Sequence, residues 1–361
     1  MSGPRVSVVV ATYDRPASIE RLVRQLAAQE MAPDAFEIVV VDDGSAAPVA
    51  PALQRLSLPC ALVVLTQPNA GAARARDRGI QAARGDLVVV LDDDMQVAGD
   101  FLTHHVSAHP AGTRRAVLGR LRLDPARAFP LFERHHARVL DCLASEILAG
   151  RWELEGANLY TGNVSFRRQD YLAVGGFDPT LRRSEDAELG IRLEKAGVAL
   201  CFSEPASALH TSDHTSVRAW MQRAFEYGVW DLRIGRKHPD VVAASPWRFL
   251  FRVSPISRPL LLASVTAPWL SRRLARLAMA VALGLDRLGS ERLALAGATF
   301  VYGLEYFRGV RAEAGSLAKA IADFRRQLRE RRADRRRLAA RGPLRGFVPG
   351  HAERNAEAGR Q

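Results

Sequence analysis

The sequence predicts an α/β fold: a mostly parallel sheet flanked by helices, followed by a helical C-terminal extension. Three observations support this prediction. Short runs of Val, Ile and Leu recur four times in the first hundred residues, and segments with helical spacing lie between them. After Trp220 the chain has a helical pattern throughout. Because a strand, a helix and a second strand in this order form a parallel pair with a right-handed crossover, we expect one sheet in the N-terminal part.

The expected elements follow in chain order. The four strands are nearly continuous apolar runs, as burial on both faces requires, and cover residues 6–10, 38–41, 62–65 and 87–91. Helices are expected at residues 18–29, 71–83, 129–148 and 185–196, and a further strand at 159–166. An Arg-rich helix is expected at 312–340 and a disordered tail from residue 342. We therefore expect three parts: a sheet domain in 1–240, a helical extension in 241–311, and the helix and tail in 312–361.

Composition excludes several classes of protein. Of the 361 residues, 48% are apolar and 25% charged, which is near the globular average and excludes a wholly disordered or collagen-like chain. The three cysteines, Cys60, Cys142 and Cys201, form no CxxC pair; this argues against a zinc ribbon or a secreted disulfide framework and fits a reducing cytoplasm. The N-terminus does not have the pattern of a signal peptide, and no run of 18 uncharged apolar residues predicts a transmembrane helix.

Positive charge is concentrated near the C-terminus. The net charge is +12, and residues 311–361 hold 14 Lys or Arg against 6 Asp or Glu. In residues 246–310 apolar blocks alternate with arginines, which fits either a helical cap or dimer surface, or peripheral membrane contact with Trp247 and Trp269 at the boundary. The basic tail would add attraction to anionic lipid. It lacks the interleaved aromatic residues of a single-strand binder, so no specific nucleic acid is expected.

Polar clusters follow three of the predicted strands. Residues 11–15 follow the first strand, Asp42 and Asp43 the second, and Asp92 to Asp94 the fourth. Ligands of open parallel sheets bind outside the carboxyl ends of the strands, so these clusters are expected to meet at one edge. Any one of them alone is equally typical of a polar turn; all three on successive buried strands favour a binding site.

The three adjacent aspartates, 92–94, suggest a cation site. Their carboxylates repel one another unless a cation neutralises them, and hard oxygen ligands suit Mg²⁺ or Mn²⁺. The alternative is a solvated acidic turn, or Asp94 acting as a helix cap. Arg74, Arg76 and Arg78 lie near the start of the preceding helix, where arginine can hold a phosphate; the alternative there is a solvated helix face.

The order of these motifs resembles that of the family 2 glycosyltransferases. Seven segments carry the resemblance: residues 8–15, 39–45, 69–79, 91–94, 161–168, 175–178 and 185–193. Together they span roughly residues 5–240. The resemblance implies a GT-A nucleotide-diphospho-sugar transferase fold, which is Rossmann-like, with residues 1–240 as the catalytic domain and an inverting reaction. The chain departs from the family pattern at Ala11, where Pro is common, and at Asp14 and Asp77, where Asn is common.

The resemblance also implies roles for individual residues. Ala11, Tyr13 and Asp43 match positions that hold the nucleobase, commonly uracil, and Arg76 lies where it could meet the diphosphate. Asp92 and Asp94 match the D-x-D motif, in which the first aspartate meets the ribose or metal and the second binds the metal. His210 matches a third metal ligand in several relatives; alternatively it is an ordinary hydrogen-bonded residue at a strand end. Gly162 and Asn163 match a loop that lines the acceptor site.

Asp186 matches the catalytic base of inverting members, with Glu185 as the second candidate. Inverting transfer needs a carboxylate that takes the proton of the acceptor hydroxyl. The alternative is that both acidic residues favour a helix N-terminus electrostatically. The sequence therefore predicts a metal-dependent, inverting glycosyltransferase that uses a nucleotide-diphospho-sugar, UDP-type favoured. The expected acceptor is a hydroxyl on a cell-envelope lipid, a polysaccharide or a small molecule.

Two other functions stay open. A nucleotidyltransferase also uses acidic strand ends, but the chain has no Gly-rich loop with a following lysine near its N-terminus. A non-catalytic protein that binds nucleotide sugar or RNA through the Arg-rich tail is the alternative from another class.

Overall fold

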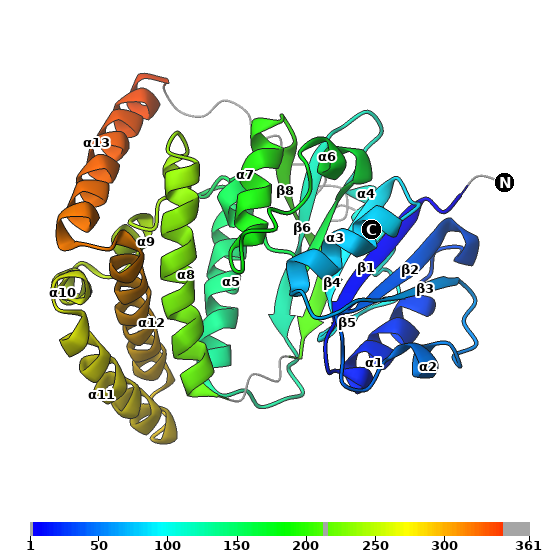
Figure 1. Cartoon of the computed structure of the whole chain (residues 1–361), viewed down its shortest axis with the longest axis horizontal. Helices are drawn as coiled ribbons and strands as arrows, with labels where there is room; N and C mark the ends of the chain where they lie inside the picture. The colour runs from blue at the N-terminus through cyan, green and yellow to red at the C-terminus, as the bar shows by residue number, and fades with distance from the viewer. Residues whose placement is uncertain (1–2, 212–215, 342–361) are drawn as a thin grey trace, which may run out of the picture.

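The computed structural model describes residues 3–211 and 216–341, with side chains described up to residue 330. Its centre is one eight-stranded sheet in the order β3-β2-β1-β4-β7-β6-β8-β5 (Figure 1). The strands are β1 (Val6–Thr12), β2 (Phe36–Asp42), β3 (Ala61–Thr66), β4 (Leu87–Asp92), β5 (Met95–Val97), β6 (Arg115–Leu123), β7 (Asn163–Arg167) and β8 (Ala199–His210). The expected α/β fold is confirmed.

The sheet is parallel in its N-terminal half and mixed beyond it. Strands β3, β2, β1 and β4 run parallel. Strand β7 runs antiparallel to both β4 and β6, β8 runs parallel to β6, and β5 runs antiparallel to β8. The register pairs Ala11 with Asp92 and Thr12 with Asp42, so the carboxyl ends of the parallel strands meet at one edge.

Helices cover both faces of the sheet. They are α1 (Pro16–Ala27), α2 (Ala50–Leu53), α3 (Ala72–Ala82), α4 (Phe101–Ser107), α5 (Leu131–Leu148), α6 (Arg168–Ala173) and α7 (Glu185–Lys195). Side chains of β1 alternate between the two cores: Val8 and Val10 pack in the core with α1 and α4, and Val9 packs in the core with α3 and α7. This arrangement explains why the first strands are apolar on both faces.

The C-terminal part is a second, helical layer beside the sheet (Figure 1). It consists of α8 (Val217–Lys237), α9 (Arg248–Arg252), α10 (Arg258–Thr266), α11 (Pro268–Arg287), α12 (Glu291–Ala314) and α13 (Leu317–Arg341). Helix α12 is the centre of this layer, and its core also takes in Leu131 and Phe132 of α5. Gly228 of α8 and Gly309 of α12 let the two helices touch, because a Cβ at either position would lie about 2 Å from a carbonyl oxygen of the other helix: 1.9 Å from Tyr306 O and 2.0 Å from Phe225 O.

Two further predictions concern the C-terminal part. The Arg-rich helix expected at 312–340 is α13, which begins at Leu317 after Gly315 ends α12 with a positive φ of 76°. The tail expected to be disordered from residue 342 lies outside the described residues. Within the described ranges, none of the helices combines the length and the apolar character that crossing a membrane would require.

Candidate active site

The loops after β2 are held by two buried aspartates. Asp42 accepts hydrogen bonds from the backbone N–H groups of Ser45 (2.9 Å) and Val49 (3.0 Å). Asp43 accepts from the backbone of Ala70 (2.9 Å) and Gly71 (2.8 Å), and from the Gln67 side chain at 2.7 Å. Asp43 therefore joins the loop after β2 to the loop that leads into α3, and its carboxylate fixes the shape of this part of the edge.

The aspartates after β4 are paired with residues from β1 and β8. The Thr12 hydroxyl donates to Asp93 at 2.7 Å, and Arg15 Nη1 donates to both Asp93 and Asp94 at 3.0 Å. Nε2 of His210, at the end of β8, lies 3.4 Å from Asp94 Oδ2. The other oxygen of Asp94, Oδ1, is buried and has no hydrogen-bond partner. This orphaned oxygen has the character of a ligand position that the protein itself does not fill.

The electrostatics of the two aspartates differ. Burial raises the pKa of Asp93 to about 6, although the Thr12 hydrogen bond and the Arg15 charge each lower it. Burial acts on Asp94 too, but its contact with His210 and the Arg15 charge lower its pKa to about 2. The same contact raises the pKa of His210 despite the burial of the imidazole. Asp94 and His210 thus form an ion pair at the sheet edge.

Arg76 joins this edge to the start of α7. Arg76 is 8% exposed, and its guanidinium donates to Asp92 Oδ1 at 2.6 Å and to Glu185 Oε1 at 3.2 Å. Burial disfavours the charge, but the charges of Asp92 and Glu185 raise the pKa of Arg76, so the guanidinium stays charged. Gly162 lies against the other oxygen of Asp92, since a Cβ at Gly162 would lie 3.1 Å from Asp92 Oδ2.

Asp186, in the first turn of α7, is the carboxyl group best suited to accept a proton. Burial and the neighbouring charge of Glu185 raise its pKa to about 7. The hydrogen bond from Ala187 N (2.8 Å) and the charge of Arg76 lower the pKa but do not outweigh these effects. The charge of Asp92 acts on it in the same direction as Glu185. A carboxyl group that titrates near neutrality can take up and release a proton at physiological pH.

Helices α8 and α12 hold the loop before α7. Ser184 has a left-handed backbone (φ 56°, ψ 21°), which is uncommon for a residue other than glycine. Its hydroxyl donates to Asp231 Oδ1 of α8 at 2.7 Å, and the Tyr306 hydroxyl of α12 donates to Asp231 Oδ2 at 2.7 Å. Arg183 donates to Glu226 of α8 at 2.9 Å. The helical layer therefore fixes the two residues that precede Glu185.

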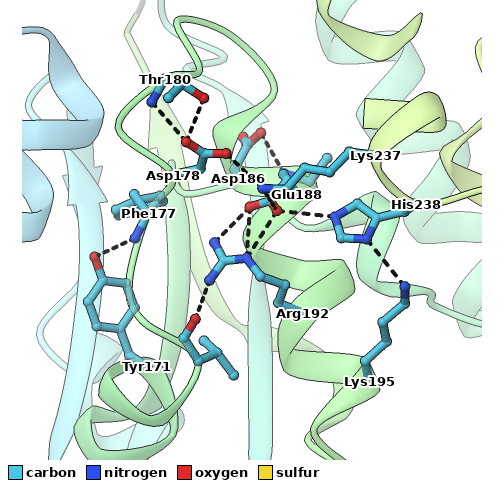
Figure 2. A network of polar contacts seen from close by, with 12 residues as sticks. Tyr171, Phe177, Asp178, Thr180, Asp186, Glu188, Arg192, Lys195, Lys237 and His238 are labelled. Atoms are coloured by element: carbon cyan, nitrogen blue, oxygen red, sulfur yellow. Dashed lines mark hydrogen bonds and ion pairs between the residues drawn. The ribbon is translucent and has the colours of Figure 1, made fainter. Parts of the chain in front are cut away.

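The remaining turns of α7 are fastened to the end of α8 through Glu188 (Figure 2). The fully buried Glu188 carboxylate accepts hydrogen bonds from Arg192 of its own helix and from Lys237 of α8, and His238 Nε2 lies 3.1 Å away. Lys237 also donates to Asp178 at 2.7 Å. Burial opposes the charge of Glu188, but the hydrogen bonds from Arg192 and Lys237 lower its pKa. Helix α7 is thus anchored over its length.

The predicted acceptor and nucleobase residues lie in different surroundings. Tyr13 is 48% exposed just past β1, and Gly162 borders Asp92. Asn163 is fully buried: its amide donates to Ala206 O (2.8 Å), and its Oδ1 pairs with His105 Nε2 (2.9 Å). In this structure the Asn163 side chain links β7 to β8 and to α4 and is not presented at the edge.

The three predicted metal ligands do not converge in this structure. Among the residues that the structure describes, no three His, Cys, Asp or Glu side chains are grouped closely enough to hold a metal ion. Asp94 and His210 are together, whereas Asp92 is turned to Arg76. Because Mg²⁺ commonly binds one or two carboxylates and completes its shell with phosphate oxygens and water, such a pair is compatible with a metal that a diphosphate brings along.

Sequence reasoning missed Arg15, Ser184 and Asp231. Arg15 lies inside a matched motif, but nothing in the sequence shows that it reaches the aspartates after β4. Asp231 looks like any acidic residue on a surface helix, because its contacts depend on how α8 packs against α7 and α12.

Comparisons with known proteins agree with this architecture. Residues 7–173 match the family model described as Glycosyl transferase family 2. The chain is 27% identical over 275 residues to a validoxylamine A glucosyltransferase from Streptomyces hygroscopicus subsp. limoneus, which covers 68% of this chain and 59% of that protein. It is 28% identical over 264 residues to a pre-mycofactocin glycosyltransferase from Mycobacterium tuberculosis, covering 67% and 50%. The chain thus spans between half and three fifths of these relatives.

A solved structure supports the fold. The mannosyltransferase PcManGT from Pyrobaculum calidifontis, solved in complex with GDP-Man and Mn²⁺, aligns with a TM-score of 0.55 and 20% sequence identity over 82% of this chain and 86% of that chain. The sheet order and this likeness show that the chain has a GT-A fold, and its residues 7–173 are similar to glycosyl transferase family 2.

Proposed function

We propose that the chain is an inverting glycosyltransferase that moves a sugar from a nucleotide-diphospho-sugar to a hydroxyl acceptor. One observation carries this proposal: Asp186, with a pKa of about 7, lies next to the Arg76 ion pairs with Asp92 and Glu185 at the carboxyl edge of the sheet. The site thus combines a proton acceptor with a permanently charged guanidinium suited to phosphate oxygens. The match of residues 7–173 to the Glycosyl transferase family 2 model supports the same reaction class.

In the proposed reaction Asp186 accepts the proton of the acceptor hydroxyl. The acceptor oxygen forms a bond to the anomeric carbon from the face opposite the diphosphate, while the bond between that carbon and the diphosphate oxygen breaks. The electron pair of the broken bond leaves with the nucleoside diphosphate. Arg76, in contact with Asp92 and Glu185, would orient the diphosphate and stabilise its charge. Glu185 is bound by Arg76, which leaves Asp186 as the preferred base.

A divalent cation, Mg²⁺ or Mn²⁺, fits the residues at the end of β4. The buried, unpartnered Oδ1 of Asp94 is a hard oxygen ligand. Asp92, which is held by Arg76, and His210, which is paired with Asp94, would have to exchange these partners for the metal to complete the protein's share of the shell. When bound, such an ion neutralises the leaving diphosphate. The related mannosyltransferase fold is known with GDP-Man and Mn²⁺, which supports a metal and leaves the nucleobase a separate question.

The proposed donor is of the UDP type, with Ala11, Tyr13 and Asp43 on the nucleobase side. The acceptor would be a hydroxyl of a cell-envelope lipid, a polysaccharide or a small molecule, and Gly162, which lies beside Asp92, would line its approach. We place the reaction in the cytoplasm, at the inner face of the membrane. The three cysteines, widely separated in the sequence and without a CxxC pair, are compatible with a reducing compartment.

The first experiment is a thermal-shift screen of nucleotide sugars with Mn²⁺, followed by transfer assays with the donor that stabilises the protein. Asp186→Asn is expected to lower transfer at least 100-fold while nucleoside diphosphate binding stays unchanged, because a general base contributes roughly 10²- to 10⁴-fold. Asp34→Asn, at an exposed aspartate away from the site, is the matched control. Transfer that survives in Asp186→Asn would contradict the assignment of the base.

Asp94→Ala tests the metal separately. It is expected to abolish the gain in nucleoside diphosphate affinity that Mn²⁺ gives the unchanged protein. An unaltered Mn²⁺ dependence in this variant would refute the role of Asp94, and binding of donor without any turnover would favour a non-catalytic nucleotide-sugar-binding protein.

A further inference from the structure

Helix α11 exposes large apolar side chains on its outer side. Its fully buried residues are Ser271, Ala275, Met279 and Ala282, and Leu274, Leu283 and Leu285 are partly buried against the same core. The exposed ones are large: Trp269, Leu270, Leu277, Val281 and Leu288. Four of them are more than half exposed: Trp269 at 67%, Leu277 at 64%, Val281 at 54% and Leu288 at 81%. A helix that only covers a core has the opposite arrangement.

These exposed residues form one stripe. At 100° per residue, positions 270, 277, 281 and 288 fall within about 40° of one another around the helix, and the small residues Gly284 and Ala280 lie to one side of them. We call this stripe, with Trp269 at its edge, the α11 face. Large apolar side chains are also exposed at neighbouring positions: Ile256, Leu260 and Leu293. Figure 1 shows α10 and α11 in the outer part of the helical layer, on the far side of α12 from the sheet.

Arginines border the α11 face. Arg272, Arg276 and Arg287 lie along one side of the stripe, and Arg273 lies over the Trp269 ring at 6.0 Å from its centroid. The acidic residues of this region, Asp286 and Glu291, are both paired with Arg134 of α5. Within the described part of the chain, none of Arg272, Arg276 and Arg287 is in an ion pair. The stripe is therefore apolar with an uncompensated positive border.

We propose that the α11 face rests on an anionic membrane surface, with the helix axis in the membrane plane. Its Leu, Val and Trp side chains would enter the boundary between headgroups and acyl chains, while the arginines would extend to the phosphates. An acidic soluble partner would explain the arginines but not the exposed leucines. A second copy of this chain would place equal positive borders against each other. Anionic lipid matches both features.

The inference concerns binding alone, so it stands or falls independently of sugar transfer. The test is flotation of the full chain with vesicles of phosphatidylglycerol and phosphatidylcholine, compared with phosphatidylcholine alone. Binding is expected only to the anionic vesicles and is expected to weaken as salt rises. Trp269→Ser with Leu277→Ser is expected to lower the partition coefficient at least 10-fold, since both side chains lose their apolar burial.

Neutralising the border gives a second, independent readout. Arg272→Gln with Arg276→Gln is expected to lower the partition coefficient about 30-fold, because each arginine near an anionic surface contributes about 1 kcal/mol. The matched controls are Val139→Ser, at an exposed apolar residue of α5, and Arg55→Gln, at an exposed arginine after α2. Both controls are expected to bind like the unchanged chain. All four substituted α11 side chains are exposed, and far-ultraviolet circular dichroism will verify that each variant is folded.

Three outcomes would overturn the proposal. The first is no flotation at low salt. The second is flotation that neither pair of α11 substitutions weakens, because binding would then reside in the basic residues 311–361. The third is a dimer, seen by analytical ultracentrifugation, in a protein that does not bind vesicles. If the double substitution Trp269→Ser with Leu277→Ser dissociates this dimer, the α11 face is a self-association surface.

Discussion

The hydrogen bond between Ser184 and Asp231 is expected to position the proposed base, and two substitutions at Ser184 separate its effects. Ser184→Ala removes the hydroxyl and with it the hydrogen bond to the half-buried Asp231 carboxylate, at a cost of about 2 kcal/mol of unfolding free energy. The left-handed backbone of Ser184 (φ 56°) costs a residue with a Cβ about 1 kcal/mol more than glycine. Ser184→Gly loses the same hydrogen bond but relieves that strain, so we expect it to be about 1 kcal/mol more stable than Ser184→Ala.

The assays are urea unfolding and initial rates of transfer with saturating donor. Both variants are expected to lower kcat with little change in the donor KM, because the loop before Glu185 and Asp186 loses its tie to α8 while the residues that would hold the nucleotide stay in place. Ser107→Ala, which removes an exposed hydroxyl bonded within its own helix, is the control and is expected to change stability by less than about 0.5 kcal/mol. Equal stability and unchanged kcat in both Ser184 variants would refute the reasoning.

Three further predictions concern the packing of the helices. Gly228→Ala is expected to destabilise the protein by about 3 kcal/mol in urea unfolding, because its Cβ would lie 1.9 Å from Tyr306 O. The control Gly284→Ala, whose Cβ would have no atom within 4 Å, is expected to raise stability by about 0.5 kcal/mol. Equal effects of the two substitutions would contradict the close contact at Gly228. Burial lowers the pKa of His135 to about 4, so its contribution to stability is complete above its unfolded pKa of about 6.5 and is lost as the pH falls toward 4. Between pH 7 and pH 5 the free energy of unfolding of His135→Phe is therefore expected to fall by about 2 kcal/mol less than that of the unchanged chain. An equal fall in both proteins would refute the lowered pKa of His135. A chain that ends at residue 240 exposes the α8 surface that packs on α12, so it is expected to aggregate or to unfold without a cooperative transition; a monomer with the melting temperature of the full chain would disprove this.

The parallel half of the sheet was predictable because its side chains are uniform. Burial on both faces requires continuous Val, Ile and Leu, and β1, β2, β3 and β4 appear where those runs occur. Each strand extends past its run, because the backbone ladder does not depend on side-chain type. In contrast, β6 and β8 include arginine, serine and a proline and have half-buried positions, so their sequences lack a strand pattern. The strand expected at 159–166 is β7, and it begins only at Asn163.

The candidate site was predictable where its residues lie at the end of a strand or at the start of a helix. Asp92, Asp94 and Asp186 are placed by the ends of β4 and the start of α7, which the sequence marks clearly. His210 lies next to Asp94 as the resemblance implies, although its role as a metal ligand stays a prediction. Residues such as Arg15 and Asp231 were not predictable, because their partners lie 78 and 47 positions away and depend on tertiary packing.

The helical layer is part of the site as well as an appendage to it. Three contacts from α8 reach the segment that carries the proposed base: Glu226 to Arg183, Asp231 to Ser184, and Lys237 to Glu188. Helix α8 in turn is held by α12 through the close approach at Gly228 and through the Tyr306 hydroxyl. Without α12, the Asp231 carboxylate, which also accepts from Ser184, would lose the hydrogen bond from Tyr306. The surroundings of Asp186 therefore depend on both layers, because the sheet supplies the edge and α8 holds the start of α7.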